Sequence, residues 1–187
     1  MGRWEPNAAG RLREAAMDLY LEQGFEQTTV AEIAARAGLT ARTFFRYFTD
    51  KREVLFGGAE LLHERLVRAL EDAPADATPI EAVAAALTAI AELLVDREFS
   101  GRRQQVIDAN AELRERELIK MATLSAALTD GLRTRGVRDS DARLAGEAGI
   151  AVFRVAFDRW VRSKDDRMLA QVVNEALSQL RTLVAAS

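Results

Sequence analysis

The feature that most constrains this chain is residues 28–51, TTVAEIAARAGLTARTFFRYFTDK, which predict two short helices joined by a tight turn. Thr29, followed three residues later by Glu32, forms the capping-box pattern that begins a helix. Gly38 supplies the left-handed residue that ends this helix, and Thr40 is a suitable cap for the next. A helix pair of this size fits a DNA major groove, so the segment predicts a helix-turn-helix that binds double-stranded DNA.

The second helix of the pair is expected to have an inward and an outward side. The inward side is predicted to consist of Phe44, Phe45 and Phe48. Arg42 and Arg46 are four residues apart, so both guanidinium groups leave the same face. The outward positions, which we expect to meet DNA, are Ala41, Arg42, Thr43, Arg46 and Tyr47.

Composition predicts an all-α protein and argues against catalysis. Of 187 residues, 49% are apolar and only three are Pro, and no stretch alternates as a strand would. With no Cys and a single His, neither a thiolate site nor a His-pair zinc site can form. The carboxylates mostly lie beside basic residues at helical spacing, as on solvated faces. We therefore expect no metal, no cofactor and no enzymatic activity.

Charge is distributed unevenly along the chain. Residues 36–52 contain five basic residues and Asp50, a net charge of +4, whereas the whole chain carries −3. The rest of the chain therefore carries −7. A small basic edge on an acidic body suits specific DNA recognition, because a strongly basic protein would bind any duplex.

Helix signals divide the chain into a DNA-binding head, residues 1–56, and a body, residues 57–187. The fourth helix is expected to begin at Asp50 and to continue as a bridge to about residue 72, where a Pro-containing linker follows. About nine helices are expected in all, over residues 7–23, two within 28–48, 50–72, 79–96, 101–109, 111–135, 141–163 and 166–185.

The N-terminal residues and the apolar runs contain no membrane signal. Residues 1–6 lack the apolar region of a signal peptide, and the run from Ala82 to Val95 is too short to span a bilayer. We expect a soluble, cytoplasmic protein. Arg3 and Trp4 form either an arm that enters the minor groove or a tail that folds back on the first helix.

The body permits a dimer interpretation and a ligand interpretation. Gly146 and Gly149 lie inside a predicted helix, which favours close approach of another helix, either from a second copy or within the chain. Arg102 and Arg103 could hold an anionic ligand group or could form a solvated turn. The residues predicted to line a hydrophobic site, or else to form core, are Phe99, Val106, Ile107, Leu118, Met121, Leu124, Phe153, Phe157 and Trp160.

The head resembles the TetR family of bacterial regulators over about residues 8–56. The resemblance rests on the run from Thr28 to Ala34, on Ala37-Gly38-Leu39, and on Phe48 followed by Asp50-Lys51. It implies a bridging fourth helix and a C-terminal ligand-binding body that forms a homodimer through its last two long helices.

The resemblance also implies roles for individual side chains. Thr29, Thr40, Tyr47 and Lys51 would contact phosphates, and Arg42, Thr43 and Arg46 would face the bases. The family commonly has Tyr where this chain has Phe45, so that hydroxyl contact is expected to be absent.

Longer runs resemble one actinobacterial branch of the family, which includes mycofactocin-type regulators and has an acyl-CoA-like ligand-binding domain. The runs are residues 3–6, 42–48 and 102–107. The branch implies an acyl-CoA-like effector, with Arg102 and Arg103 near its phosphates. We expect a homodimeric repressor that a small hydrophobic effector releases from a near-palindromic operator. A regulator switched through its body by a protein partner is the alternative.

Overall fold

The structure, a computed structural model, describes residues 7–185, and every regular element in these residues is a helix. This confirms the all-α prediction. The chain forms two compact units: a head unit, Met1–Gly58 with Arg102–Glu115, and a body unit, Ala59–Gly101 with Arg116–Ser187. The arm expected at Arg3 and Trp4 lies outside the described residues.

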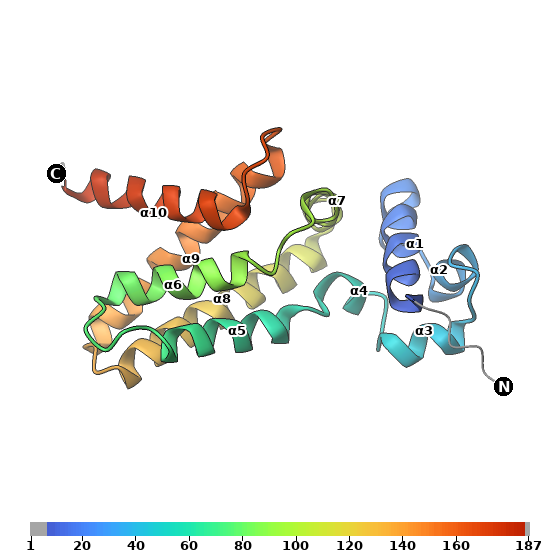
Figure 1. Cartoon of the computed structure of the whole chain (residues 1–187). Coiled ribbons are helices and arrows are strands. Elements are labelled where there is room, and N and C mark those ends of the chain that lie inside the picture. Colours follow the sequence, from blue (N-terminus) through green and yellow to red (C-terminus); the bar gives the residue numbers. More distant parts are fainter. Residues whose placement is uncertain (1–6, 186–187) are drawn as a thin grey trace. The chain divides into compact units, whose positions relative to one another are not determined.

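The head unit begins with three helices in which α2 packs against both α1 and α3 (Figure 1). Their bounds are α1 Ala8–Gln23, α2 Val30–Arg36 and α3 Ala41–Tyr47. Gly24, with φ 91°, ends α1 in a backbone conformation that glycine adopts readily. The three helices meet in an apolar core that includes Leu12, Ala16, Met17, Ile33 and Phe44.

The predicted continuous bridging helix is wrong, because the structure divides it into α4 (Glu53–Phe56) and α5 (Ala59–Glu71). Gly57 and Gly58 stand between them, and glycine is a poor helix former because its backbone loses the most entropy on folding. The predicted start is confirmed in part, since Asp50 Oδ1 accepts hydrogen bonds from the N–H groups of residues 52 and 53 at 2.7 and 3.0 Å. This division adds one helix to the nine expected.

The body unit contains α5 and all or part of five further helices. These are α6 Pro79–Ala91, α7 Arg97–Asp108, α8 Ala111–Thr134, α9 Asp139–Arg162 and α10 Leu169–Ala185, of which α7 and α8 contribute residues 102–115 to the head unit. α6 packs against α5, α9 and α10 (Figure 1). Side chains cap the starts of α6 and α8: the Thr78 N–H donates to Glu81 Oε2 at 2.9 Å, and the Leu113 N–H donates to Asn110 Oδ1 at 3.1 Å.

The two glycines of α9 are explained within the protomer. A Cβ at Gly146 would lie 2.6 Å from Thr129 Oγ1, and one at Gly149 would lie 2.5 Å from Val83 Cγ1. Both distances are far below van der Waals contact, so each glycine allows a neighbouring helix of the same body to approach. The use of these glycines as evidence for a dimer is therefore wrong.

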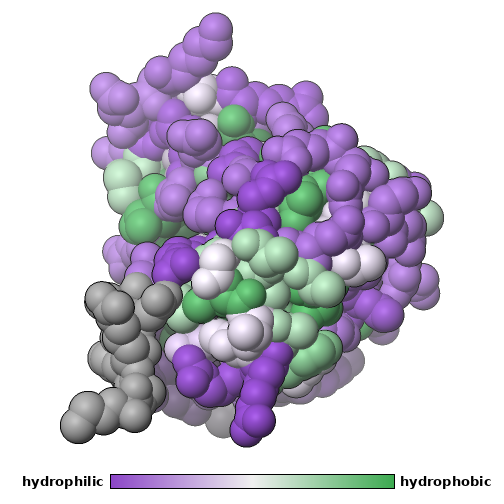
Figure 2. Space-filling model, turned by 90° about the vertical axis from the view of Figure 1, so that its right-hand side faces the viewer, coloured by the Kyte–Doolittle hydropathy of each residue, from purple (hydrophilic) through white to green (hydrophobic). Residues whose placement is uncertain are grey.

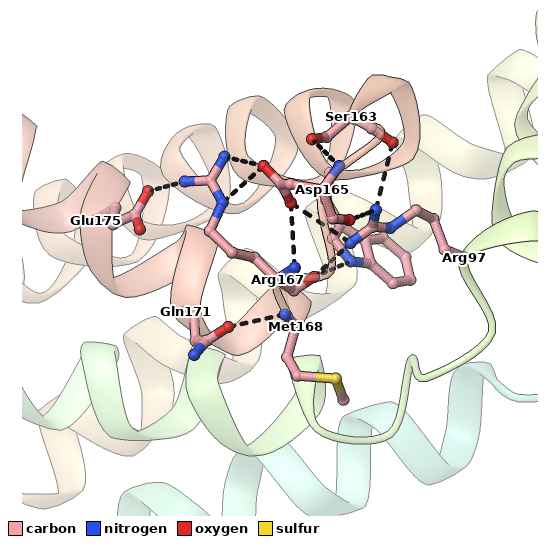
Figure 3. Close-up of polar contacts among 8 residues, drawn as sticks. Arg97, Ser163, Asp165, Arg167, Met168, Gln171 and Glu175 are labelled. Atoms are coloured by element: carbon pink, nitrogen blue, oxygen red, sulfur yellow. Dashed lines mark hydrogen bonds and ion pairs between the residues drawn. The ribbon is translucent and has the colours of Figure 1, made fainter.

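An arginine-centred cluster holds the connection between α9 and α10 (Figure 3). The Arg97 guanidinium donates to the backbone carbonyls of residues 163, 165 and 167, and it lies 5.4 Å from the centre of the Trp160 ring. The Trp160 indole N–H donates to the Arg167 carbonyl at 3.1 Å. Arg167 in turn pairs with Asp165 and Glu175, each at 2.6 Å. These contacts fix the start of α10.

Candidate nucleic-acid interface

The turn between α2 and α3 is a Schellman motif. Gly38 has φ 67°, its N–H donates to the Ala35 carbonyl at 2.9 Å, and the Leu39 N–H donates to the Ala34 carbonyl at 2.8 Å. Arg11 of α1 also donates to the Ala37 carbonyl. The angle between the two helices is thus set by backbone hydrogen bonds, as the sequence predicts from Gly38.

The capping box predicted at the start of α2 is present. The Glu32 N–H donates to Thr29 Oγ1 at 3.3 Å, and the Thr29 N–H and hydroxyl each donate to Glu32 Oε2 at 2.8 Å. These bonds, chiefly the one from the Thr29 backbone, lower the pKa of Glu32. The hydroxyl proton of Thr29 is therefore directed toward Glu32, and its predicted phosphate contact would have to replace that bond.

Thr40 caps α3 as predicted. Its Oγ1 accepts from the Thr43 N–H at 3.2 Å and lies 3.0 Å from Thr43 Oγ1. On the inner side, Phe44 is fully buried and Phe48 is nearly so, and their ring centres are 5.3 Å apart. These contacts hold the seven-residue α3 against the head.

The outward side of α3 combines basic, aromatic and small residues. Ala41, Arg42, Arg46 and Tyr47 are all exposed. The Arg46 guanidinium donates to the Tyr47 hydroxyl at 2.9 Å and lies over its ring. Arg42 has no ion pair or hydrogen bond from its side chain within residues 7–185. The head surface in Figure 2 is mostly hydrophilic, with a smaller apolar area.

The inward prediction for Phe45 is wrong. Its side chain is 58% exposed. The Phe45 ring makes an edge contact with the Phe44 ring, and the two ring centres are 5.6 Å apart. The physical reason is helical geometry, because Phe44 and Phe48 are four residues apart and fill the inner side. Phe45 is about 100° around the helix from Phe44 and shares the outward side with Ala41 and Arg42.

Lys51 is engaged inside the head. Its Nζ donates to the carbonyls of Phe25, Glu26 and Thr28 at 2.7, 3.2 and 3.0 Å, and it lies 4.4 Å from the centre of the Phe25 ring. An ammonium group has three donors. All three are used here, so the predicted phosphate contact would have to displace a hydrogen bond that shapes the α1–α2 turn.

A buried tyrosine supports the same region. The Tyr20 hydroxyl donates to the Lys51 carbonyl at 2.6 Å. Burial, and secondarily the charge of Asp50, raises the pKa of Tyr20 above its ordinary value. The hydroxyl therefore remains a donor at neutral pH and links α1 to the start of α4.

Arg102 and Arg103 have partners in the head unit that the sequence did not reveal. Arg102 forms ion pairs with Glu14, at 2.9 Å, and with Asp18. The Arg103 Nε–H donates to the Leu55 carbonyl at 2.7 Å, and its guanidinium lies over the Phe56 ring. These contacts compete with the anionic-ligand role predicted for both arginines.

The remaining residues of the predicted ligand site are divided between the units. Val106 and Ile107 are buried and belong to the head unit, whereas the other seven belong to the body unit. The prediction is wrong for Leu118, which is 56% exposed, and Phe99 is half-buried. The other five lie in or against the hydrophobic core: Met121, Leu124, Phe153, Phe157 and Trp160. Sequence analysis did not single out Ser125. Its buried Oγ has no hydrogen-bond partner in the described part of the chain.

Residues 7–185 contain no group of three or more His, Cys, Asp or Glu side chains that could hold a metal ion. They also contain no helix long and apolar enough to cross a bilayer.

Comparison with known proteins points to one family. Residues 12–56 match the family described as bacterial regulatory proteins, tetR family. The transcriptional regulator TcmR of Streptomyces glaucescens is 37% identical over 91 residues, which cover 49% of this chain but only 40% of TcmR. The fatty acid metabolism regulator protein of Bacillus subtilis is 27% identical over 175 residues, covering 89% of this chain and 90% of that protein.

A solved structure extends the similarity to the body. It is the transcriptional regulator FadR from Bacillus subtilis in complex with stearoyl-CoA, with a TM-score of 0.61 and 25% identity. The match covers 91% of this chain and 96% of the FadR chain.

Proposed function

We propose that this chain is a DNA-binding transcriptional regulator of the TetR type, and that it acts as a homodimeric repressor released from a near-palindromic operator by an acyl-CoA-like effector. The observation that carries the DNA part is the outward side of α3, where Arg42 and Arg46 are exposed on a helix held by a Schellman turn. Arginine reads guanine in the major groove through two hydrogen bonds. Each α3 would enter one major groove.

An apolar stripe on α9 supports the homodimer. Leu144, Ala148, Ala151 and Val155 follow one another at intervals of four, three and four residues, which places them on one side of the helix. Leu144 is 71% exposed and Val155 is 50% exposed. A second copy of the same helix would bury this stripe, and it would also set two α3 helices about 34–36 Å apart, as a twofold operator requires.

The body supports an acyl chain as the effector. Aromatic and aliphatic side chains, among them Met121, Leu124 and Phe153, are buried together there. Ser125 Oγ in this core lacks a partner, and a thioester carbonyl could accept its hydrogen bond. Arg102, Arg103 and Val106 are left out of the proposed site because they belong to the head unit. FadR, which is similar over most of its length, was solved with stearoyl-CoA.

Selection of bound duplexes from a random pool tests the DNA part. We expect enrichment of an inverted repeat whose half-sites are about 10 base pairs apart. Recovery of no common sequence would contradict the proposal.

Calorimetric titration with stearoyl-CoA, with stearate as the control, tests the effector part. The thioester should bind saturably and weaken binding to the selected duplex by about 5- to 150-fold. Ser125→Ala should reduce the affinity for the thioester, whereas Thr123→Ala, at an exposed position of the same helix, should not. Absence of heat with ligand-free protein, or an unchanged DNA affinity, would contradict the proposed effector.

A further inference from the structure

Phe45 is the most unusual side chain on the outward side of α3. A 58% exposed phenyl ring forgoes much of the burial that stabilises phenylalanine, although Phe44 and Phe48 on the same helix are buried. Single exposed apolar residues are common on proteins and need no special explanation. Phe45, however, lies on the helix that is proposed to enter the major groove, where an exposed apolar ring could contact a base.

The neighbours of Phe45 complete a mixed surface. Ala41 lies four residues before it on the same side of the helix and is exposed. Arg42 and Arg46 are also exposed, and they lie next to these two side chains in the neighbouring row of the helix surface. A pair of guanidinium groups suits the negative charge and guanine edges of a duplex, whereas the apolar pair beside them can form a hydrogen bond with neither a phosphate nor a base edge.

One group in the major groove matches that apolar pair. Thymine presents its C5-methyl there, and alanine and phenylalanine side chains contact this methyl group. Cytosine lacks the methyl, so the contact distinguishes thymine from cytosine. Phenylalanine also has no hydroxyl that would draw the ring toward a phosphate.

We propose that Phe45, with Ala41, is a specificity-determining contact that reads the C5-methyl group of one thymine in each operator half-site. This inference rests on the proposed entry of α3 into the major groove. It assigns a base to a residue that the sequence placed in the core.

Uracil substitution tests the inference at the level of a single methyl group. In the duplex selected by the wild-type protein, each thymine is replaced in turn by deoxyuridine, which keeps the base pair and removes only the methyl. At one position per half-site we expect the affinity of the wild-type protein, measured by fluorescence anisotropy, to fall about fourfold. This fold-change corresponds to the free energy gained when one methyl group is buried.

The variants identify the side chain that is responsible. Phe45→Ala should bind the thymine and uracil duplexes equally at that position. Leu21→Ala, which truncates another exposed apolar side chain of the head, is the control and should retain the full methyl effect. Thermal denaturation of each variant checks that the head remains folded.

The outcomes separate this inference from the proposed function. An enriched inverted repeat with no methyl-dependent thymine, or with the same methyl effect in Phe45→Ala as in the wild type, would overturn the Phe45 contact and leave the repressor proposal intact. Failure to enrich any sequence would overturn both.

Discussion

At the residue scale, Lys51 shows how a side chain can match a family pattern and still have a different use in the fold. Its ammonium group donates to three carbonyls of the α1–α2 turn. Hydrogen bonds to a charged group are worth about 1.5–3 kcal/mol each, and their loss leaves carbonyls without a partner. We therefore assign Lys51 to the shape of the head.

Replacement of Lys51 by Met tests this assignment. We expect the free energy of unfolding to fall by about 1–3 kcal/mol, while the salt dependence of DNA binding keeps its slope. Arg42→Met is the control, because Arg42 is exposed and has no partner among the described residues, so its replacement should leave the stability within about 0.5 kcal/mol of wild type. Normal stability of Lys51→Met with a shallower salt slope would instead indicate a phosphate contact.

Asp165 gives a pH-dependent prediction. Hydrogen bonds from the Arg167 side chain, and then from Ser163, lower the pKa of Asp165 below its ordinary value of 3.8. Because the pKa is lower in the folded than in the unfolded protein, the ionised carboxylate stabilises the fold at pH values above the unfolded pKa. This stabilisation is lost as the pH falls through the pKa of the folded state. Asp165→Asn should therefore have a lower thermal midpoint than wild type at about pH 5 and above, with a difference that narrows below about pH 4.

The control for this experiment is Asp166→Asn, at the exposed neighbouring position. It should leave the thermal midpoint close to that of the wild type from pH 3 to 7. A difference between Asp165→Asn and wild type that stays constant down to pH 3 would contradict the role of the ionised carboxylate.

At the element scale, helix starts and turns were predictable because their signals are local. The capping box of Thr29 and Glu32 and the left-handed Gly38 lie within a few residues of the backbone groups that they satisfy. The partners of Arg102, by contrast, are 84 and 88 residues away in sequence. No local sequence pattern could predict these partners. For the same reason, the sequence could not predict that the residues of the expected ligand site are divided between two units.

The close packing of α9 gives a stability prediction. Gly149→Ala would place a Cβ 2.5 Å from Val83 Cγ1, and we expect it to destabilise the body by about 1–3 kcal/mol through overpacking. The matched control is Gly101→Ala in α7, where the nearest atoms, of Val161, are 4.0 Å away. That change should stabilise the helix by about 0.5–1 kcal/mol. Equal effects of the two changes in chemical denaturation would contradict this description of α9.

At the scale of the whole molecule, the proposed function depends on two copies acting together. The α9 stripe lies on the side away from the glycines that pack inside the protomer, so the proposed dimer contact would not disturb that packing. The last two long helices are the expected dimer interface, and the exposed Leu144 and Val155 support this for α9.

Leu144→Glu tests the homodimer. A carboxylate within the apolar contact should raise the dissociation constant of the dimer at least about tenfold, because burying an unpaired charge is costly. Sedimentation equilibrium measures the change. Ala126→Glu, at an exposed position of α8, is the control and should leave the association state unchanged. A wild-type protein that sediments as a monomer, or a Leu144→Glu variant that remains dimeric, would contradict the α9 interface.

Sequence-specific DNA binding through α3 is the central claim, and fluorescence anisotropy at one fixed salt concentration tests it most directly. The wild-type protein should bind the selected duplex at least about 1,000-fold more tightly than a scrambled duplex of the same composition. Arg42→Ala should lose about 1–3 kcal/mol on the selected duplex and much less on the scrambled one. Equal binding of both duplexes by the wild type, or an equal loss on both in Arg42→Ala, would contradict base recognition by α3.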